Sequence, residues 1–262
     1  MSADHTLLLV KLRTADGVLL HADHRPHTRT DLCVVLAHGF TNHTRTPHVR
    51  RIGEGLGQYL PVLAYDGRGH GRSGGHSTVG DLEPLDVDVA VAAARQLGYE
   101  RVVTCGWSLG ASNVLRHAGL RGREVGGHLL RNPPDAVVSV SALSRWYYRD
   151  TVPMRRVHYA IERRTGRAFA RAVFGTRIWH QDWEVLPLSP AQAVALIAPI
   201  PLLLIHGDRD AYFPVEHPQA LLAASGGHAE LWLEPGMGHA EKATSPELVA
   251  RIAAHIQNLV PA

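Results

Sequence analysis

The stretch Gly106-Trp107-Ser108-Leu109-Gly110 follows a short apolar run over residues 101–105 and precedes a helix-compatible run over residues 111–115. A strand, a G-x-S-x-G pentapeptide and a helix in this order are typical of a nucleophile elbow, which lifts the serine hydroxyl out of the chain. Glycines remove side chains where the strand and the helix would otherwise collide. We therefore predict that Ser108 is a nucleophile, although an incidental serine in a glycine-rich turn would give the same five letters.

The composition predicts a globular protein with one large core. The 262 residues exceed what such a core requires, and α/β folds of this length often form one domain. No apolar run approaches the roughly 20 residues that a membrane helix needs. Residues 1–5 lack the basic start and apolar core of a signal peptide, so we expect a cytoplasmic protein without a membrane span.

Charge and cysteine usage argue against several kinds of partner. The net charge is only +3 and the arginines are scattered among acids, so we expect no nucleic-acid partner. Cys33 and Cys105 lie in apolar runs, which predicts buried free thiols. The 18 histidines include no H-E-x-x-H spacing, so we expect no metal and no cofactor, and we expect most histidines on the surface.

Short apolar runs alternate with longer helix-like stretches, which predicts a mostly parallel sheet with helices on both faces. The first two runs flank Asp16-Gly17, a strong hairpin signal that predicts an antiparallel start. The expected strands cover residues 6–13, 18–25, 32–37, 61–65, 102–105, 136–142, 201–205 and 229–233. The expected helices cover residues 47–59, 82–97 and 246–259.

The interval between residues 142 and 201 contains no convincing strand. It holds many of the aromatic residues, namely Trp146, Tyr147, Tyr148, Phe169, Phe174, Trp179 and Trp183. Residues 155–174 predict a basic, amphipathic helical region. We expect residues 143–189 to form a helical cap over the carboxyl edge of the sheet, where open α/β sheets bind ligands. Residues 1–142 and 190–262 would then form the core; the alternative is a pair of peripheral helices whose aromatic side chains pack down.

Residues suited to activate Ser108 follow two later strands. A serine hydroxyl needs a base, and the base needs an acid that orients it. Asp208 and Asp210 follow the predicted strand over residues 201–205, and His239 follows the next strand in a glycine-rich turn. Loops after parallel strands meet at one edge of the sheet, so the chain supplies nucleophile, acid and base in the order Ser, Asp, His.

Five motifs at the ends of predicted strands resemble those of the α/β-hydrolase fold superfamily, and the resemblance covers nearly the whole chain. They are His38-Gly39-Phe40, Asp66-Gly67-Arg68-Gly69-His70-Gly71-Arg72-Ser73, the Ser108 pentapeptide, the H-G-x-x-D-x-x-x-P segment at 206–214 and G-x-G-H at 236–239. The pattern is most similar to capped serine hydrolases of the esterase, lipase and serine-aminopeptidase-like kind, such as monoacylglycerol lipase-like enzymes. It implies an α/β-hydrolase fold with an eight-stranded, mostly parallel sheet and a helical cap inserted after strand 6.

The resemblance also implies roles for individual residues. Ser108 is the nucleophile and His239 the base, and the spacing favours Asp210 as the acid over Asp208. A few relatives place the acid after the sixth strand, which would point near Asp150. The backbone N–H groups of Phe40 and Leu109 would form the oxyanion hole. The candidate substrate contacts are Trp107, Trp146, Tyr147 and Trp179.

Several other polar residues have two interpretations each. His43, Arg45 and His48 follow the H-G-x motif and could face the pocket or the solvent at the start of a helix. Arg155 and Arg156 could meet an acidic substrate or lie on an exposed helix face. Four further residues are expected to make structural hydrogen bonds or to brace loops: His38, His206, Asp66 and Arg68.

A serine at the elbow argues against epoxide hydrolase and haloalkane dehalogenase relatives, which use aspartate there. We expect a cofactor-free serine hydrolase, monomeric or homodimeric, that cleaves carboxylic esters of small or medium acyl groups through an acyl-enzyme intermediate. Trp107 and Ala111 depart from the elbow common in lipases, and the arginine-rich cap counts against an aminopeptidase. The alternatives are a thioesterase or acyltransferase of a biosynthetic pathway, and a ligand-binding member with slow turnover.

Overall fold

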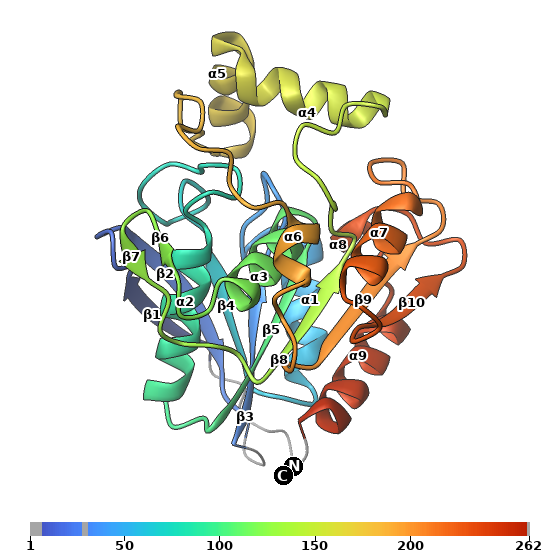
Figure 1. Ribbon diagram of the computed structural model, residues 1–262. Helices are drawn as coiled ribbons and strands as arrows, with labels where there is room; N and C mark the ends of the chain where they lie inside the picture. Colours follow the sequence, from blue (N-terminus) through green and yellow to red (C-terminus); the bar gives the residue numbers. More distant parts are fainter. Residues whose placement is uncertain (1–6, 28–30, 261–262) are drawn as a thin grey trace.

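A computed structural model describes residues 7–27 and 31–260, so Thr6 and residues 1–5 lie outside the described part (Figure 1). Its centre is an eight-stranded sheet in the order β1-β2-β4-β3-β5-β8-β9-β10. Strand β2 is antiparallel to β1 and β4, and the remaining neighbours are parallel. The strands are β1 (Leu8–Arg13), β2 (Leu19–Arg25), β3 (Leu32–Ala37), β4 (Val62–Asp66), β5 (Arg101–Trp107), β8 (Ala136–Val140), β9 (Leu202–Gly207) and β10 (Glu230–Glu234).

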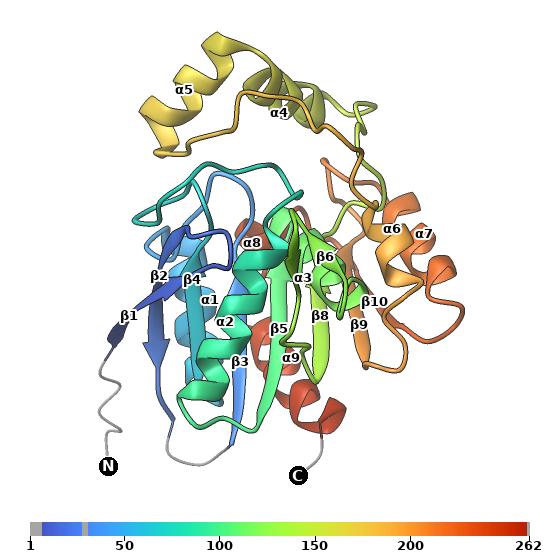
Figure 2. The same cartoon turned by 60° about the vertical axis from the view of Figure 1, so that its left-hand side comes forward.

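Helices cover both faces of this sheet (Figures 1 and 2). One face packs against α1 (Pro47–Gly57) and α9 (Pro246–Leu259). The other packs against α2 (Pro84–Gln96), α3 (Leu109–Gly119), α6 (Pro190–Val194) and α7 (Glu216–Ala224). The predicted α/β architecture and its antiparallel start are therefore confirmed.

Strands β3, β4, β8 and β9 are buried along their whole length. Burial on both faces requires apolar side chains at successive positions, which is why these strands are continuous apolar runs in the sequence. The edge strands β1 and β10 are partly exposed instead. The two cysteines lie in the central strands and are buried free thiols, as predicted.

Several short elements have no counterpart in the prediction: α6, α7, the helix α8 (Ala240–Ala243) and a two-stranded ribbon of β6 (Glu124–Val125) and β7 (His128–Leu129). Strands of two residues are too short to show an alternating pattern, so the sequence carries no periodic signal for them. The ribbon turns at Gly126-Gly127, where both glycines have positive φ angles.

The chain inserts α4 (Val152–Glu162) and α5 (Arg164–Phe174) after β8, the sixth strand of the central sheet. The two helices lie above the carboxyl ends of the strands, separate from the helices that cover the faces of the sheet (Figures 1 and 2). Arg163 adopts an extended backbone and separates them, so the predicted basic helical region consists of two helices. The segment that follows α5 pairs with the core through a β-bridge between Ser77 and Ile178.

The histidines are more buried than expected, because most of those that the structure describes are half-buried rather than exposed. Among the histidines that the structure describes, only His76 and His180 are exposed. Others sit beneath the strand-end loops and bond to main-chain atoms; His70, for example, lies 2.9 Å from the oxygen of Arg68. Burial lowers the pKa of His70 to about 3, so its ring is neutral.

Gly119 lies where α3 packs closely against α6. A Cβ atom at this position would overlap the main-chain oxygen of Ala193. We predict that Gly119→Ala lowers the free energy of unfolding by about 2 kcal/mol, the usual scale of overpacking. Urea denaturation of both variants would measure this against Gly53→Ala, where a Cβ meets no heavy atom within 4 Å. A loss of equal size in Gly53→Ala would contradict the packing argument.

Candidate active site

Ser108 occupies the sharp turn between β5 and α3, with φ of 52° and ψ of −116°. A positive φ is strained for any residue with a side chain and costs on the order of 1–3 kcal/mol. The flanking glycines make the turn possible, because a Cβ on Gly106 would overlap the oxygen of Gly110 and one on Gly110 would overlap that of Ala37. The serine is thereby held at the carboxyl end of a central strand.

Ser108 is joined to His239 and Asp210 by two hydrogen bonds. The Oγ of Ser108 lies 2.9 Å from His239 Nε2, and His239 Nδ1 lies 2.7 Å from Asp210 Oδ2. A carboxylate can only accept at Nδ1, so this nitrogen carries the ring proton and Nε2 is free to accept the serine proton. The three residues come from three different loops, after β5, β9 and β10.

Asp210 is held in its ionised form. Burial alone would raise the pKa of this carboxyl, but the hydrogen bond and charge of His239 and the N–H of Phe213 lower it below its ordinary value. Its Oδ1 accepts from the N–H groups of Tyr212 and Phe213, at 2.8 and 3.0 Å. These bonds fix the carboxylate and leave Oδ2 for the histidine.

The other two candidate acids lie elsewhere. Asp208 is exposed, and its Oδ1 accepts from the N–H of Gly236 at 2.6 Å. Asp150 is exposed and lies 3.5 Å from Arg145. Neither bonds to His239, so the geometry agrees with Asp210 as the partner of the histidine.

Two aromatic side chains clamp the His239 ring. Tyr212 stacks on it with ring centroids 4.3 Å apart, and Phe213 meets it edge-on at 5.3 Å. Sequence reasoning did not single out either residue, because aromatic residues within the H-G-x-x-D-x-x-x-P segment carry no signal of their own. The clamp restricts the imidazole to the plane in which it reaches both Ser108 and Asp210.

Phe40 and Leu109 line the same cavity as Ser108, and each carries a main-chain N–H group. Within the described ranges, neither donates to a protein acceptor. The two loops are in close contact, since a Cβ on Gly39 would lie 3.1 Å from the Cβ of Ser108. Leu109 also begins α3, whose N-terminal end carries partial positive charge. Unused donors at this position can stabilise negative charge beside the serine.

Glu241, on the short helix α8 (Ala240–Ala243), is a site residue that no sequence motif indicates. Its carboxyl group is buried, and Oε1 accepts from the N–H of Gly39 at 2.6 Å and from the amide of Asn42 at 3.1 Å. His239 is the residue that precedes α8. Glu241 therefore ties the helix that follows the histidine to the loop that presents the Phe40 N–H.

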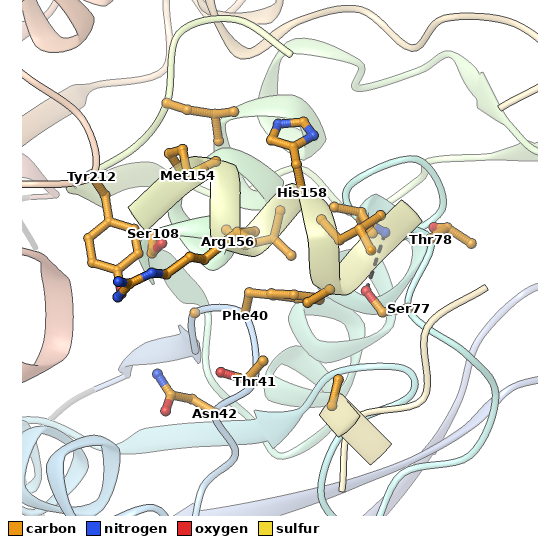
Figure 3. A pocket seen from close by; sticks show the side chains of 18 of the residues that line it. Phe40, Thr41, Asn42, Ser77, Thr78, Ser108, Met154, Arg156, His158 and Tyr212 are labelled. Carbon is orange, nitrogen blue, oxygen red and sulfur yellow. Dashed lines mark hydrogen bonds between the residues drawn. The ribbon is translucent and has the colours of Figure 1, made fainter. Parts of the chain in front are cut away.

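A large open cavity of about 2450 Å³ lies between these residues and the helices α4 and α5 (Figure 3). Trp146, Tyr147 and Trp179 line it, as expected of substrate contacts. Trp107 does not, and its predicted role is wrong. Its side chain is fully buried among the residues packed around α1 and α9, where the indole N–H donates to Thr244 Oγ1 at 3.0 Å.

The remaining polar candidates divide between the cavity and the scaffold. His43 and His48 line the cavity, whereas Arg45 is exposed outside it. The rings of His38 and His206 lie 2.8 and 2.7 Å from main-chain oxygens.

Asp66 and Arg68 brace loops, as expected. Asp66 accepts from the N–H groups of Thr44 and Arg72, and Arg68 pairs with Asp86 and Asp16.

Metal-binding clusters and membrane-spanning helices are both absent from residues 7–27 and 31–260. No group of three or more histidine, cysteine, aspartate or glutamate side chains there could hold a metal ion. No helix within the same residues has both the length and the apolar character needed to cross a bilayer.

The chain belongs to the alpha/beta hydrolase family, whose model matches residues 34–252. It is similar in structure to the esterase Pf2001 of Pyrococcus furiosus, with a TM-score of 0.73 and 24% identity over 97% of this chain and 93% of that one. GrgF of Penicillium sp. sh18, an alpha/beta hydrolase, gives a TM-score of 0.72 and 16% identity over 97% and 98% of the two chains. At these identities the likeness establishes a shared fold.

Glu241 offers a test of how the site is held together. Glu241→Ala leaves the buried N–H of Gly39 without an acceptor, which we predict lowers the free energy of unfolding by about 1–3 kcal/mol. Chemical denaturation would measure the loss. Glu184→Ala removes an exposed carboxylate of the same kind and should change stability by less than about 0.5 kcal/mol. Equal stability of the two variants would contradict the role given to Glu241.

Proposed function

We propose that the protein is a serine hydrolase that cleaves carboxylic esters of small or medium acyl groups. The observation that carries this proposal is the hydrogen-bonded series Ser108, His239 and Asp210, of which Ser108 and His239 line the cavity. Membership of the alpha/beta hydrolase family supports hydrolysis, and the esterase Pf2001 shares the fold.

The reaction proceeds in two halves. In the first, the Nε2 of His239 accepts the proton of Ser108 as Oγ attacks the acyl carbon, and the same nitrogen then gives the proton to the departing alcohol. In the second, His239 takes a proton from water as the water attacks the acyl-enzyme, and it then gives this proton to the departing Oγ of Ser108 as the acid is released. Asp210 stabilises the imidazolium in both halves, which the buried, ionised carboxylate is suited to do.

Negative charge develops on the acyl oxygen in both halves. The N–H groups of Phe40 and Leu109 serve as the oxyanion hole, because they line the cavity beside Ser108 and have no acceptor among the described residues. Such preorganised donors commonly supply the largest single part of catalysis in acyl transfer.

Residues 143–189 act as a cap that selects the substrate. Helices α4 and α5 lie over the strand ends, and their aromatic and aliphatic side chains form the roof of the cavity (Figures 2 and 3). The volume exceeds the roughly 300–1,000 Å³ of common ligand pockets. A thioesterase or acyltransferase would use the same chemistry, so the roof and not the triad decides between an ester and a thioester.

Replacing the nucleophile tests the proposal directly. Ser108→Ala should lower turnover of p-nitrophenyl butyrate by about 10⁴- to 10⁶-fold, the scale of losing the nucleophile of a catalytic triad. The wild-type protein should also be labelled at Ser108 by a fluorophosphonate probe. Hydrolysis retained in the variant would refute the triad, and a folded wild-type protein that is not labelled would favour a ligand-binding member of the fold.

The two aspartates on the loop after β9 provide a matched comparison. Asp210→Asn should reduce kcat by about 10³- to 10⁴-fold, because an amide at this position no longer holds His239 in the required tautomer. Asp208→Asn should stay within about threefold of the wild type, since the Asp208 carboxylate accepts from the N–H of Gly236 and not from His239. Steady-state kinetics measures kcat for both variants, and a larger loss of kcat in Asp208→Asn than in Asp210→Asn would reverse the assignment of the acid.

A further inference from the structure

The segment that roofs the cavity is unusually basic. Residues 143–189 contain nine arginines and four acidic residues, while the whole chain has a net charge of only +3. Several of these arginines are neutralised or engaged locally. Arg149 pairs with Glu162, Arg145 lies 3.2 Å from Glu216, and Arg155 donates to the main-chain oxygens of Arg149 and Asp150. Arg155 is therefore a residue that fastens the start of α4.

Arg156, the next residue, behaves differently. It lines the cavity, and its guanidinium makes no hydrogen bond or ion pair with any part of the chain that the structure describes. Figure 3 shows its side chain extending from α4 toward the side of the cavity where Tyr212 and Ser108 lie. An unpaired cation thus faces the space that the substrate of Ser108 would occupy.

Two more cations line this cavity from other elements, Arg209 on the loop after β9 and Lys242 on α8. The side chains of both also lack a hydrogen-bonded or ionic partner within the described ranges. Their loops carry Asp210 and His239, so their charges arise at the same end of the cavity as the triad. Together with Arg156 they give this end a positive potential, which favours an anionic group.

The carboxylates that line the cavity do not cancel this charge. Glu241 is occupied by Gly39 and Asn42. Asp182 and Glu184 belong to the segment after α5, where Trp183 donates to the oxygen of Thr78. Figure 3 places Thr78 at the opposite end of the cavity from Tyr212. Asp182 and Glu184 therefore lie away from Arg156, as does Asp81, which follows Thr78 by three residues. Asp16 and Glu162 also line the cavity, and they pair with Arg68 and Arg149.

We propose that the substrate carries an anionic group, a carboxylate or a phosphate, which Arg156 binds beside the reacting acyl carbon. This inference rests on the proposed function and narrows its substrate class. A guanidinium matches the two oxygens of such a group with parallel hydrogen bonds, so the contact orients the substrate as well as attracting it. The anion can belong to the acyl part, as in a dicarboxylic half-ester, or to the leaving group, as in a coenzyme A thioester.

Two pairs of substrates test both sources. The first pair is the mono-p-nitrophenyl ester of glutarate and neutral p-nitrophenyl butyrate; the second is butyryl coenzyme A and neutral butyryl N-acetylcysteamine. For each pair, the preference is the kcat/KM of the anionic substrate divided by that of the neutral one. In at least one pair this ratio should exceed one in the wild type, and Arg156→Gln should lower it by about tenfold or more. Arg156→Lys should retain part of the preference for the anionic substrate, and a higher salt concentration should reduce this preference in the wild type.

Arg164→Gln is the matched control, because it removes the same charge from the first residue of α5, which is exposed and does not line the cavity. Its ratios should equal those of the wild type. Ratios that are unchanged in Arg156→Gln, or that fall equally in Arg164→Gln, would overturn the anion site.

A binding measurement separates this inference from the proposed function. Glutarate should bind the wild-type protein in titration calorimetry and should bind Arg156→Gln at least several-fold more weakly. If this holds while no ester or thioester is hydrolysed, the anion site stands and the hydrolase proposal fails. If neutral esters are hydrolysed through Ser108 but neither ratio nor glutarate binding depends on Arg156, the hydrolase stands and the anion site fails.

Discussion

The strained backbone of Ser108 is the constraint on which the rest of the site depends. Its positive φ is compatible with the fold only because two glycines let α3 begin directly against β5 and β3. The N–H of Ser108 bonds to the oxygen of Val140 at 2.9 Å, so the neighbouring strand β8 holds the turn as well. The strain is borne by the most buried part of the sheet, where the surrounding packing is close enough to maintain it.

The other groups of the site are arranged around that fixed hydroxyl. His239 is located by a hydrogen bond to Asp210 and by the stacked ring of Tyr212, and Glu241 connects the following helix to the loop of Phe40. Each contact joins loops that follow different strands. Parallel strands bring these loops to a single edge, so the catalytic groups can be far apart in sequence and still share one cavity.

Much of the fold and the nucleophilic centre could be predicted from the sequence. Central strands are continuous apolar runs, and Ser108 and Asp210 each follow a buried strand, whereas His239 follows the edge strand β10. The error at Trp107 has a physical cause. Successive side chains of a strand point to opposite faces, but β5 is buried on both, so the sequence does not show which face Trp107 takes.

Contacts between loops could not be predicted from the sequence for a different reason. Glu241 and Tyr212 act through neighbours that lie close only in the folded chain, and a single glutamate or tyrosine has no spacing that reveals this. The histidines were misjudged in the same way, because partners for a buried ring are supplied by main-chain atoms of distant loops. Arg155 and Arg156 are neighbours in sequence and both line the cavity, yet only the structure distinguishes the arginine whose guanidinium fastens α4 from the one whose guanidinium has no partner among the described residues.

The central claim is that Ser108 forms a covalent acyl-enzyme. The most direct measurement is mass spectrometry of peptides from protein that is mixed with p-nitrophenyl butyrate and quenched in acid within milliseconds. The account predicts one added butyryl group, on the peptide and side chain of Ser108, which disappears as turnover is completed. Rapid ester hydrolysis with no adduct, or with an adduct on another residue, would contradict it.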